Sequence, residues 1–421
     1  MKEMKFNKFY FIFLGLMILS LFLLQVTEAE AQNSCLECHR ELEDGLRAPV
    51  EAFKNDIHQK FGLTCVSCHG GNEKEDDLES AKDSSFKGTP GRKQIPAFCG
   101  DCHQDSDYIR KYNPSLRIDQ LGLYWTSQHG KLLKKGDIKV AVCIDCHGSH
   151  GILEASHPKS LVFPWNLPSM CGRCHSDKEY MREYSIPITQ EKDYRESVHA
   201  RALFEKKDLS AAVCNDCHGN HGAMPPGVSA IAFVCHQCHP SASELFSQSP
   251  HKEAFGEMGI SECEACHENH RILPPRDEML GTGEESVCLN CHEQGSKGFE
   301  VSSLYRNRIE SFKNKIKKME EILETAERKG VEVSESKFDL REAQNLLVMV
   351  RNLTHSLNVD DFEKKINEGE EILSSVQEKG EKALNEAKFR KRGLIIATIF
   401  IFLLATAIFL KIKKIEKKIE R

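Results

Sequence analysis

The sequence has no cysteine outside one short pattern. All 18 cysteines of the 421-residue chain belong to C-x-x-C-H pentapeptides, so no residue is left for a disulfide framework or a free catalytic thiol. An excess of positive charge is also missing, because the formal net charge is −6. That balance argues against nucleic acid as a partner and favours small or basic partners.

The C-x-x-C-H pentapeptide is typical of c-type haem attachment. Two thiols three positions apart can form thioethers to the two vinyl groups on one edge of a haem. The next residue then lies beneath the ring, where an imidazole nitrogen can bind the iron. Zinc sites and thioredoxin-type redox pairs also use C-x-x-C, but neither needs a histidine directly after the second cysteine every time. The sequence therefore predicts nine covalently bound c-type haems.

Position within each pentapeptide assigns two roles. The cysteines are expected to attach the haems: Cys35, Cys38, Cys65, Cys68, Cys99, Cys102, Cys143, Cys146, Cys171, Cys174, Cys214, Cys217, Cys235, Cys238, Cys263, Cys266, Cys288 and Cys291. The final histidines are expected to be the proximal iron ligands: His39, His69, His103, His147, His175, His218, His239, His267 and His292.

A repeat orders these motifs along the chain. Its clearest copies contain AVCIDCHGSHG from Ala141 and AVCNDCHGNHG from Ala212, and a third contains CEACHENH from Cys263. Each copy has an upstream histidine, a pentapeptide, a histidine three residues past it, and then a second pentapeptide. A degenerate copy begins at His58, and the Cys35 motif stands alone before it. Such recurrence indicates a repeated structural unit.

Histidines at the recurring positions are the candidates for the distal ligand of each iron. They are His58, His129, His150, His199, His221, His251 and His270. A residue three positions past a proximal histidine lies on the same helical face, so it cannot reach the far side of the same iron. We therefore expect His150, His221 and His270 to bind the iron of a different haem and to pin neighbouring haems together.

Seven distal candidates are too few for nine irons. Three histidines are weaker candidates: His157 precedes a proline and has no equivalent in the repeat, His236 lies inside its own pentapeptide, and His355 lies off the apolar seam of the second stalk helix. A methionine such as Met224 or Met258 is a further alternative. An iron that lacks a second ligand can bind a substrate, whereas an iron with two histidines is suited to passing electrons.

Both ends of the chain carry apolar runs. Residues 1–31 have a basic start, an apolar stretch and an Ala29-Glu30-Ala31 site, which predicts a secretory signal peptide, with an uncleaved anchor as the alternative. Residues 393–410 are uncharged and predict a transmembrane helix. The basic tail, residues 411–421, places that end in the cytoplasm, so we expect an exported, periplasmic haem region anchored in the cytoplasmic membrane.

Residues 299–390 contain no cysteine and show helical periodicity. Apolar residues recur at spacings of three and four, as in Ile309, Phe312, Ile316, Met319, Leu323 and Ala326. Gly330 and the stretch around Asn358 interrupt the pattern, and Asp360 with Glu363 predicts a helix start. This segment is expected to form a stalk of three antiparallel helices, resembling a coiled coil.

The haem region, residues 33–298, offers under thirty residues for each haem. That is too little chain for an ordinary apolar core around every cofactor. We expect a mainly α fold with little regular structure in the haem region, where the haems themselves form most of the core.

The motifs resemble those of multihaem c-type cytochromes of the doubled C-x-x-C-H type over residues 35–292. A looser resemblance is to membrane-anchored tetrahaem quinol dehydrogenases, whose first haem closely follows an N-terminal anchor, as Cys35 follows the apolar run. The helical segment after the last haem is also similar to that of multihaem nitrite reductases and hydroxylamine oxidoreductases. No C-x-x-C-Lys motif is present, which removes one marker of the nitrite reductases.

These observations favour a membrane-anchored electron-transfer cytochrome of a respiratory chain. The expected partners are a quinol-oxidising membrane complex and periplasmic acceptors. The alternative is a reductase or dehydrogenase that acts on a small nitrogen or sulfur compound at a haem with an open axial position. A third interpretation, a subunit that organises a larger respiratory complex, is compatible with the first.

Overall fold

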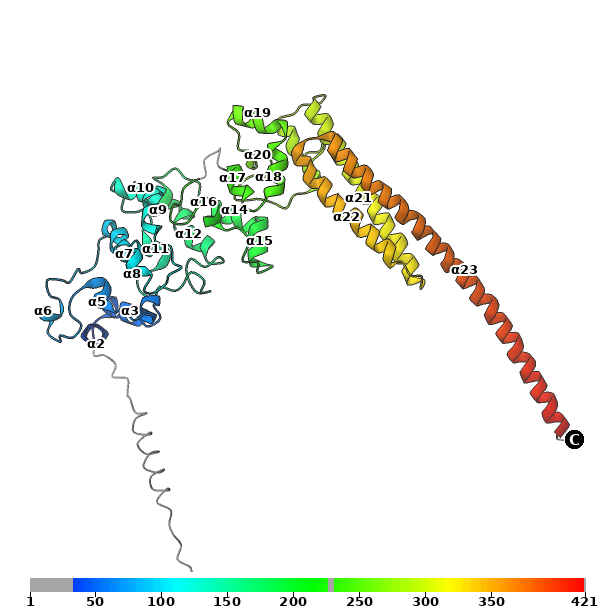
Figure 1. Ribbon diagram of the computed structural model, residues 1–421, viewed down its shortest axis with the longest axis horizontal. Helices are drawn as coiled ribbons and strands as arrows, with labels where there is room; N and C mark the ends of the chain where they lie inside the picture. The colour runs from blue at the N-terminus through cyan, green and yellow to red at the C-terminus, as the bar shows by residue number, and fades with distance from the viewer. Residues whose placement is uncertain (1–32, 226–230, 420–421) are drawn as a thin grey trace, which may run out of the picture. The chain divides into compact units, whose positions relative to one another are not determined.

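The structure is a computed structural model that describes residues 33–225 and 231–419 (Figure 1). The predicted signal peptide, residues 1–31, lies outside these residues. Within the described ranges the regular structure is helical and no strand is present. The chain divides into two compact units, the first ending at Glu183 but including Val213–Met224, the second comprising Tyr184–Ala212 and Pro225–Arg421. This division falls within the region that carries the haem motifs.

The first unit consists of short helices joined by loops, as expected for a chain with few residues per haem. Its helices are α2 (Ser34–Arg40), α3 (Asp44–Phe53), α4 (Ile57–Lys60), α5 (Cys65–His69), α6 (Leu78–Ala81), η1 (Arg92–Gln94), α7 (Ile95–His103), α8 (Ser106–Ile109), α9 (Gln120–Thr126), α10 (Gln128–Lys134), α11 (Cys143–His147), α12 (Leu167–His175), α13 (Lys178–Met181) and α16 (Cys214–His218). Many begin at a side-chain cap, which lets helices of one or two turns form without a large apolar face.

The second unit begins with the same kind of structure. Its short helices are α14 (Gln190–Glu196), α15 (Val198–Phe204), α17 (Ile231–His236), α18 (Pro240–Ser247), α19 (Pro250–Met258), α20 (Glu264–His267), η3 (Asp277–Met279) and η4 (Val287–Asn290). They lead into the stalk, where an ordinary apolar core appears.

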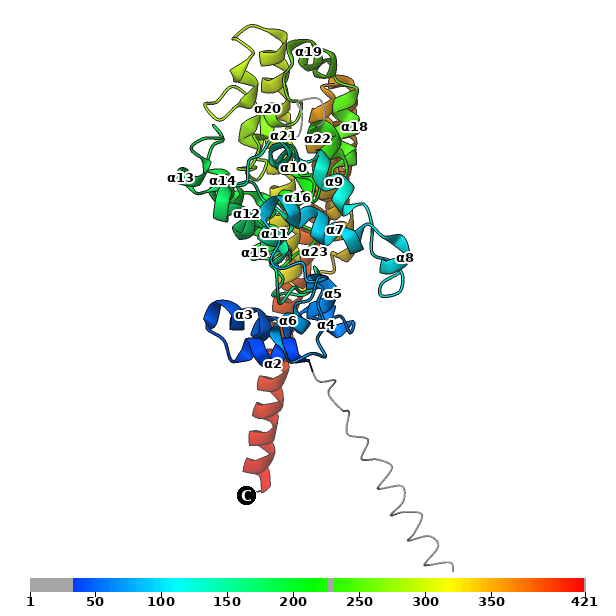
Figure 2. The same cartoon turned by 90° about the vertical axis from the view of Figure 1, so that its left-hand side faces the viewer.

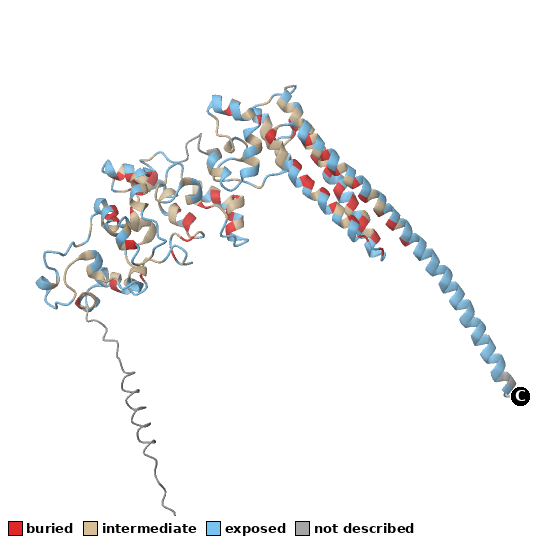
Figure 3. Ribbon diagram, in the orientation of Figure 1, coloured by how far each residue is buried: buried red, intermediate tan, exposed pale blue. Residues whose placement is uncertain are grey.

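Three long helices form the stalk: α21 (Lys297–Arg328), α22 (Ser334–Leu353) and the first part of α23 (Val359–Ile419). The predicted seam is buried between them, and Ile309, Phe312 and Phe362 are fully buried (Figure 3). A 3₁₀ turn, η5 (Thr354–Ser356), joins α22 to α23. The predicted helix start at Asp360 was wrong, because α23 begins at Val359 and the side chain of Asn358 accepts from the backbone N–H groups of Asp360 and Asp361.

The last part of α23 has no packing partner within this unit. The helix runs without a break from the stalk through residues 393–410, and in two perpendicular views it continues alone beyond α21 and α22 (Figures 1 and 2). Every residue of 393–410 is exposed. Within the described chain α23 is long and apolar enough to cross a membrane, which agrees with the predicted span.

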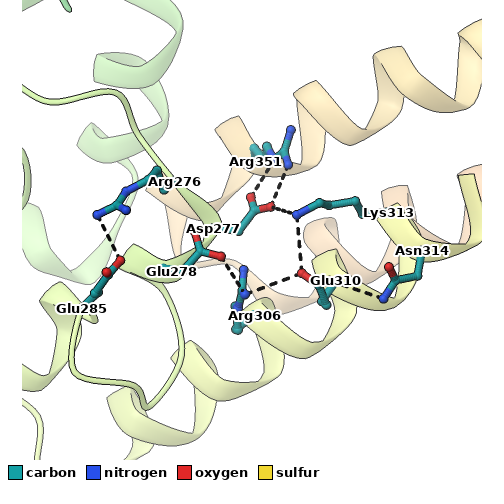
Figure 4. A network of polar contacts seen from close by, with 9 residues as sticks. All are labelled: Arg276, Asp277, Glu278, Glu285, Arg306, Glu310, Lys313, Asn314 and Arg351. Atoms are coloured by element: carbon teal, nitrogen blue, oxygen red, sulfur yellow. Dashed lines mark hydrogen bonds and ion pairs between the residues drawn. The ribbon is translucent and has the colours of Figure 1, made fainter. Parts of the chain in front are cut away.

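A buried carboxylate joins the last haem-motif loop to the stalk (Figure 4). Asp277, in η3, is 8% exposed. Its oxygens accept hydrogen bonds from Arg351 Nε at 2.8 Å and Nη2 at 2.7 Å, and from Lys313 Nζ at 3.2 Å. Burial acts to raise the pKa of Asp277, but the hydrogen bonds and charges of Arg351 and Lys313 outweigh it and the pKa is lowered. The carboxylate is therefore ionised and ties α21 and α22 to the haem-bearing loop.

Replacing Asp277 with Asn should lower the free energy of unfolding by about 1–3 kcal/mol, because charged hydrogen bonds are lost at a buried site. The difference in the free energy of unfolding between wild type and variant should be largest above the ordinary pKa of aspartate. It should disappear as the pH falls through the lowered pKa of the folded state. Urea unfolding followed by far-UV circular dichroism measures both. Glu285→Gln, at an exposed pair with Arg276, is the control and should change stability little. A D277N effect no larger than the control's would contradict this role.

Candidate haem sites

The first pentapeptide of three repeat copies forms a five-residue helix of its own. Helices α5, α11 and α16 each begin at the first cysteine and end at the proximal histidine. The next residue in each case is a glycine with a positive φ: 69° at Gly70, 83° at Gly148 and 80° at Gly219. With ψ near 180°, this backbone conformation is essentially restricted to glycine. It ends the helix abruptly, and after α11 and α16 the chain turns into a loop that carries the histidine three residues past the motif, His150 and His221.

The second pentapeptides of the first two copies are placed differently. They form the last turns of nine-residue helices, α7 and α12, and each of these helices has a proline in its first turn, Pro96 and Pro168. Proline suits the first turn because the backbone N–H that it lacks has no intrahelical acceptor there. In these two copies the first motif therefore forms a five-residue helix, and the second motif forms the end of a nine-residue helix.

The upstream histidines share one position. His58, His129, His199 and His251 are each the second residue of a helix, in α4, α10, α15 and α19. The residue two positions earlier is the N-cap and is buried: Asp56, Ser127, Ser197 and Ser249. Because the cap fixes the first turn, it also fixes the direction of the histidine that follows.

Most of the predicted ligands face one another in pairs. Imidazole centroids lie 5.9–6.3 Å apart in His58–His103, His69–His150, His129–His175, His147–His221, His199–His239, His251–His292 and His267–His355. An iron held by two imidazoles at about 2 Å each, with about 1.1 Å from nitrogen to ring centre, requires about 6.2 Å between centroids. The paired rings therefore fit a bis-histidine haem iron, with the thiols of each C-x-x-C beside one ring of the pair.

The pairs follow the order of the repeat. Each upstream histidine faces the proximal histidine of the second motif in its own copy, as His129 faces His175. The histidine three residues past a motif faces the first motif of the preceding copy, as His221 faces His147. The expected exchange of ligands between haems is thus present in the geometry at His150 and His221.

Backbone hydrogen bonds tie the two kinds of distal histidine together. The N–H of Ile57, before His58, donates to the carbonyl of Ile152 at 2.7 Å, two residues past His150. The same bond joins Gln128 to Ala223 and Val198 to Ile272. Three of the four upstream helices, α4, α10 and α15, therefore hold the loop that follows the first motif of the next copy.

His355 is the residue that sequence reasoning ranked too low. It lies in η5 of the stalk and faces His267, with centroids 6.1 Å apart and planes 22° apart. Its Nδ1 is 2.8 Å from the carbonyl of Asn352, to which it donates in the tautomer that leaves Nε2 free for a metal. His355 of the stalk thus takes the position that a histidine from the next copy holds at His69 and at His147. The sequence held one signal for this residue. A lone histidine lies where the helical pattern of the stalk is interrupted, and the His267 motif had no distal partner.

Other contacts surround the histidines outside these seven pairs. In the described residues no imidazole faces His39, whose Nδ1 lies 3.4 Å from the Leu46 carbonyl. His157 accepts from the backbone of Lys159, and His236 is exposed. His270 holds the same repeat position as His150 and His221, with Nδ1 3.2 Å from Asn269 Oδ1, and it stays a predicted ligand. The sulfur of Met224 is contacted by Lys131, and its carbonyl lies 3.2 Å from His218 Nδ1, whereas Met258 is exposed.

Burial favours the neutral form of several of the paired imidazoles, and a metal ligand must be neutral. Burial, with His221 opposite, lowers the pKa of His147 to about 4. The pKa values of His103, His129 and His267 are lowered by burial as well, with their facing histidines as the next cause.

Successive motifs also lie close together. The thiols of Cys99 and Cys143 are hydrogen-bonded to each other, as are those of Cys235 and Cys263. Helix α12 likewise contacts α16. Cofactors attached at these cysteines would be neighbours within each unit. In the part of the chain that the structure describes, no three His, Cys, Asp or Glu side chains converge as a metal-ion site needs, so pairs, and not zinc-like clusters, characterise these sites.

Comparison with known families gives two matches. A model described as Cytochrome c3 matches residues 57–176, and one described as Doubled CXXCH motif matches residues 257–297. The first covers the degenerate copy and the copy after it, and the second covers the last two pentapeptides. No curated protein and no solved structure matches the chain.

Glu268 follows the His267 motif in the position that glycine holds elsewhere, with φ 62° and ψ −170°. Such a conformation costs a non-glycine residue about 1–3 kcal/mol. Glu268→Gly should therefore stabilise the protein by about 1 kcal/mol after the entropic cost of glycine. Thermal unfolding by circular dichroism checks this.

Gly148→Ala is the matched opposite and should destabilise by at least as much. If both variants unfold at the same temperature as the wild type, the positive φ does not restrict the choice of residue at these helix ends.

Proposed function

Because the chain is a multihaem c-type cytochrome, we propose that it is a membrane-anchored electron carrier of a respiratory chain, holding nine haems on the periplasmic side. The observation that carries this proposal is the set of seven facing histidine pairs. A side chain on each face of the iron leaves no position for a substrate, which suits an electron carrier. Bound haem supplies one-electron chemistry, whose potential depends on axial ligands, burial and hydrogen bonds.

In this proposal the two histidines of each pair have separate roles. The proximal histidine comes from the same short helix as the cysteines, so it is placed with the attached cofactor. The distal histidine comes from another part of the chain: an upstream helix, the next repeat's loop, or the stalk in the case of His355. Each distal ligand thus cross-links two segments, and these cross-links supply much of the folding energy that an apolar core would supply elsewhere.

The order of the motifs supports a continuous path within each unit. Thiols of consecutive motifs are adjacent at Cys99 with Cys143 and at Cys235 with Cys263. Electrons would therefore pass between haems in sequence order. The tail, residues 411–421, carries six basic and two acidic residues, which favours the cytoplasm for that end and the opposite side for the haems. A quinol-oxidising membrane complex as donor and periplasmic acceptors complete the proposal.

A second candidate rests on His39. Because no imidazole faces its ring in the described residues, the haem of Cys35 and Cys38 has one histidine on offer and a vacant side. This favours, at that single haem, the alternative of a reductase or dehydrogenase for a small nitrogen or sulfur compound.

The two candidates are separated by low-temperature EPR of the oxidised, detergent-solubilised full chain, with haem content from a pyridine haemochrome assay. The carrier predicts nine haems per chain, with low-spin signals from all haems whose histidines are paired. High-spin signal from several haems would sink the bis-histidine assignment. A single high-spin signal that shifts on addition of nitrite, hydroxylamine or cyanide would favour the second candidate.

His355→Ala tests the stalk ligand. The variant should keep all its haems, because the thioethers remain, but one haem should change from low-spin to high-spin in the EPR spectrum. His236→Ala, which alters an exposed histidine, is the control and should leave the spectrum unchanged. Identical spectra for the H355A variant and wild type would remove His355 from the ligand set.

A further inference from the structure

One N-cap of the repeat differs from its equivalents. The residue two positions before the upstream histidine is serine in three copies, Ser127, Ser197 and Ser249, and aspartate in the first, Asp56. All four are buried, and Asp56 is 1% exposed. A serine would suffice for the cap, because Ser127 and Ser197 accept from the first turn of their helices. The aspartate therefore brings something beyond capping, namely a buried negative charge.

That charge is aimed at the imidazole of His58. Asp56 Oδ1 lies 2.8 Å from His58 Nδ1 and 2.8 Å from the His58 backbone N–H, while Oδ2 accepts from the Ile152 N–H at 2.8 Å. The carboxylate is thus held from two segments. Its hydrogen bond from Nδ1–H leaves Nε2 of His58 to face His103, whose ring centroid is 6.0 Å away.

The physical effect of this contact has a definite sign. A carboxylate that accepts a hydrogen bond from a ligating imidazole makes the imidazole a stronger donor to the metal. A buried negative charge near the iron also favours the more positive, oxidised state, and low surrounding dielectric strengthens that effect. Both effects lower the reduction potential. A neutral acceptor, such as the Asn352 carbonyl at His355, does this less strongly.

We propose that Asp56 is a positioning and tuning residue that lowers the reduction potential of the haem attached at Cys99 and Cys102. Its potential is lower than it would be with the serine that the other copies carry. Compared with serine at this position, the aspartate makes reduction of that haem less favourable. The inference rests on the proposed bis-histidine ligation at His58 and His103.

The test is a spectroelectrochemical redox titration of the full-length holoprotein and of Asp56→Ser, which installs the residue of the other copies. In the variant, the part of the absorbance change that belongs to one haem should occur at a higher potential than in wild type. Asp56→Asn, which keeps size and cap but removes the charge, should shift the same share in the same direction and covers the case in which D56S does not fold. Asp77→Ser is the matched control, because Asp77 caps α6 without contacting a histidine, and its curve should superimpose on wild type.

Haem content and low-spin EPR signals should be unchanged in the Asp56 variants. Curves that superimpose on wild type, or a shift to lower potential, overturn the inference. His58→Ala distinguishes failure of the tuning role of Asp56 from failure of the proposed ligation by His58. If H58A gains no high-spin signal, the ligation itself is wrong, whereas a gain in H58A together with unshifted Asp56 variants rejects only the tuning role.

Discussion

Two imidazoles that face each other across the width of one metal ion are the contact on which the haem region depends. Buried apolar residues of that region, such as Leu133, Val142 and Leu203, lie outside the apolar cluster of the stalk, and the described helices there are mostly one or two turns long. In the proposed bis-histidine haems, order comes largely from distal histidines that reach across from another segment. Removal of the cofactor should therefore cost this region far more structure than it costs the stalk, which has a core of its own.

The repeat explains why the stalk belongs to the electron-transfer part of the molecule. The first motifs at Cys65 and Cys143 are each faced by a histidine of the next copy. The last copy has no successor, and η5 of the stalk presents His355 there instead. Repeat arrays need an atypical end unit, and here the end unit is a helical bundle. Asp277, with Arg351 and Lys313, holds that bundle against the loop it completes.

Much of this could be read from the sequence because the information is local or recurs. The pentapeptides predict the cysteine and proximal roles, recurrence predicts which histidines are distal candidates, and a spacing of three and four predicts the stalk helices. His355 was ranked low because its partner is decided by how η5 docks, which no local pattern records. The start of α23 was misplaced by the same limitation, since Asn358 and Asp360 are equally good caps and only the course of the chain chooses between them.

The unbroken helix α23 sets the distance between the turn that carries His355 and the start of the apolar stretch. From Val359, next to the turn that carries His355, to the first residue of the apolar stretch at Gly393 are 34 residues of one helix, a rise of about 51 Å. A rod of this kind keeps the stalk end of the cofactor chain well clear of the lipid surface. In the proposed membrane-anchored arrangement, a protein lying flush with the membrane could not touch that end, whereas a tall complex or a diffusing carrier could, so the length of the helix would limit which partners exchange electrons there.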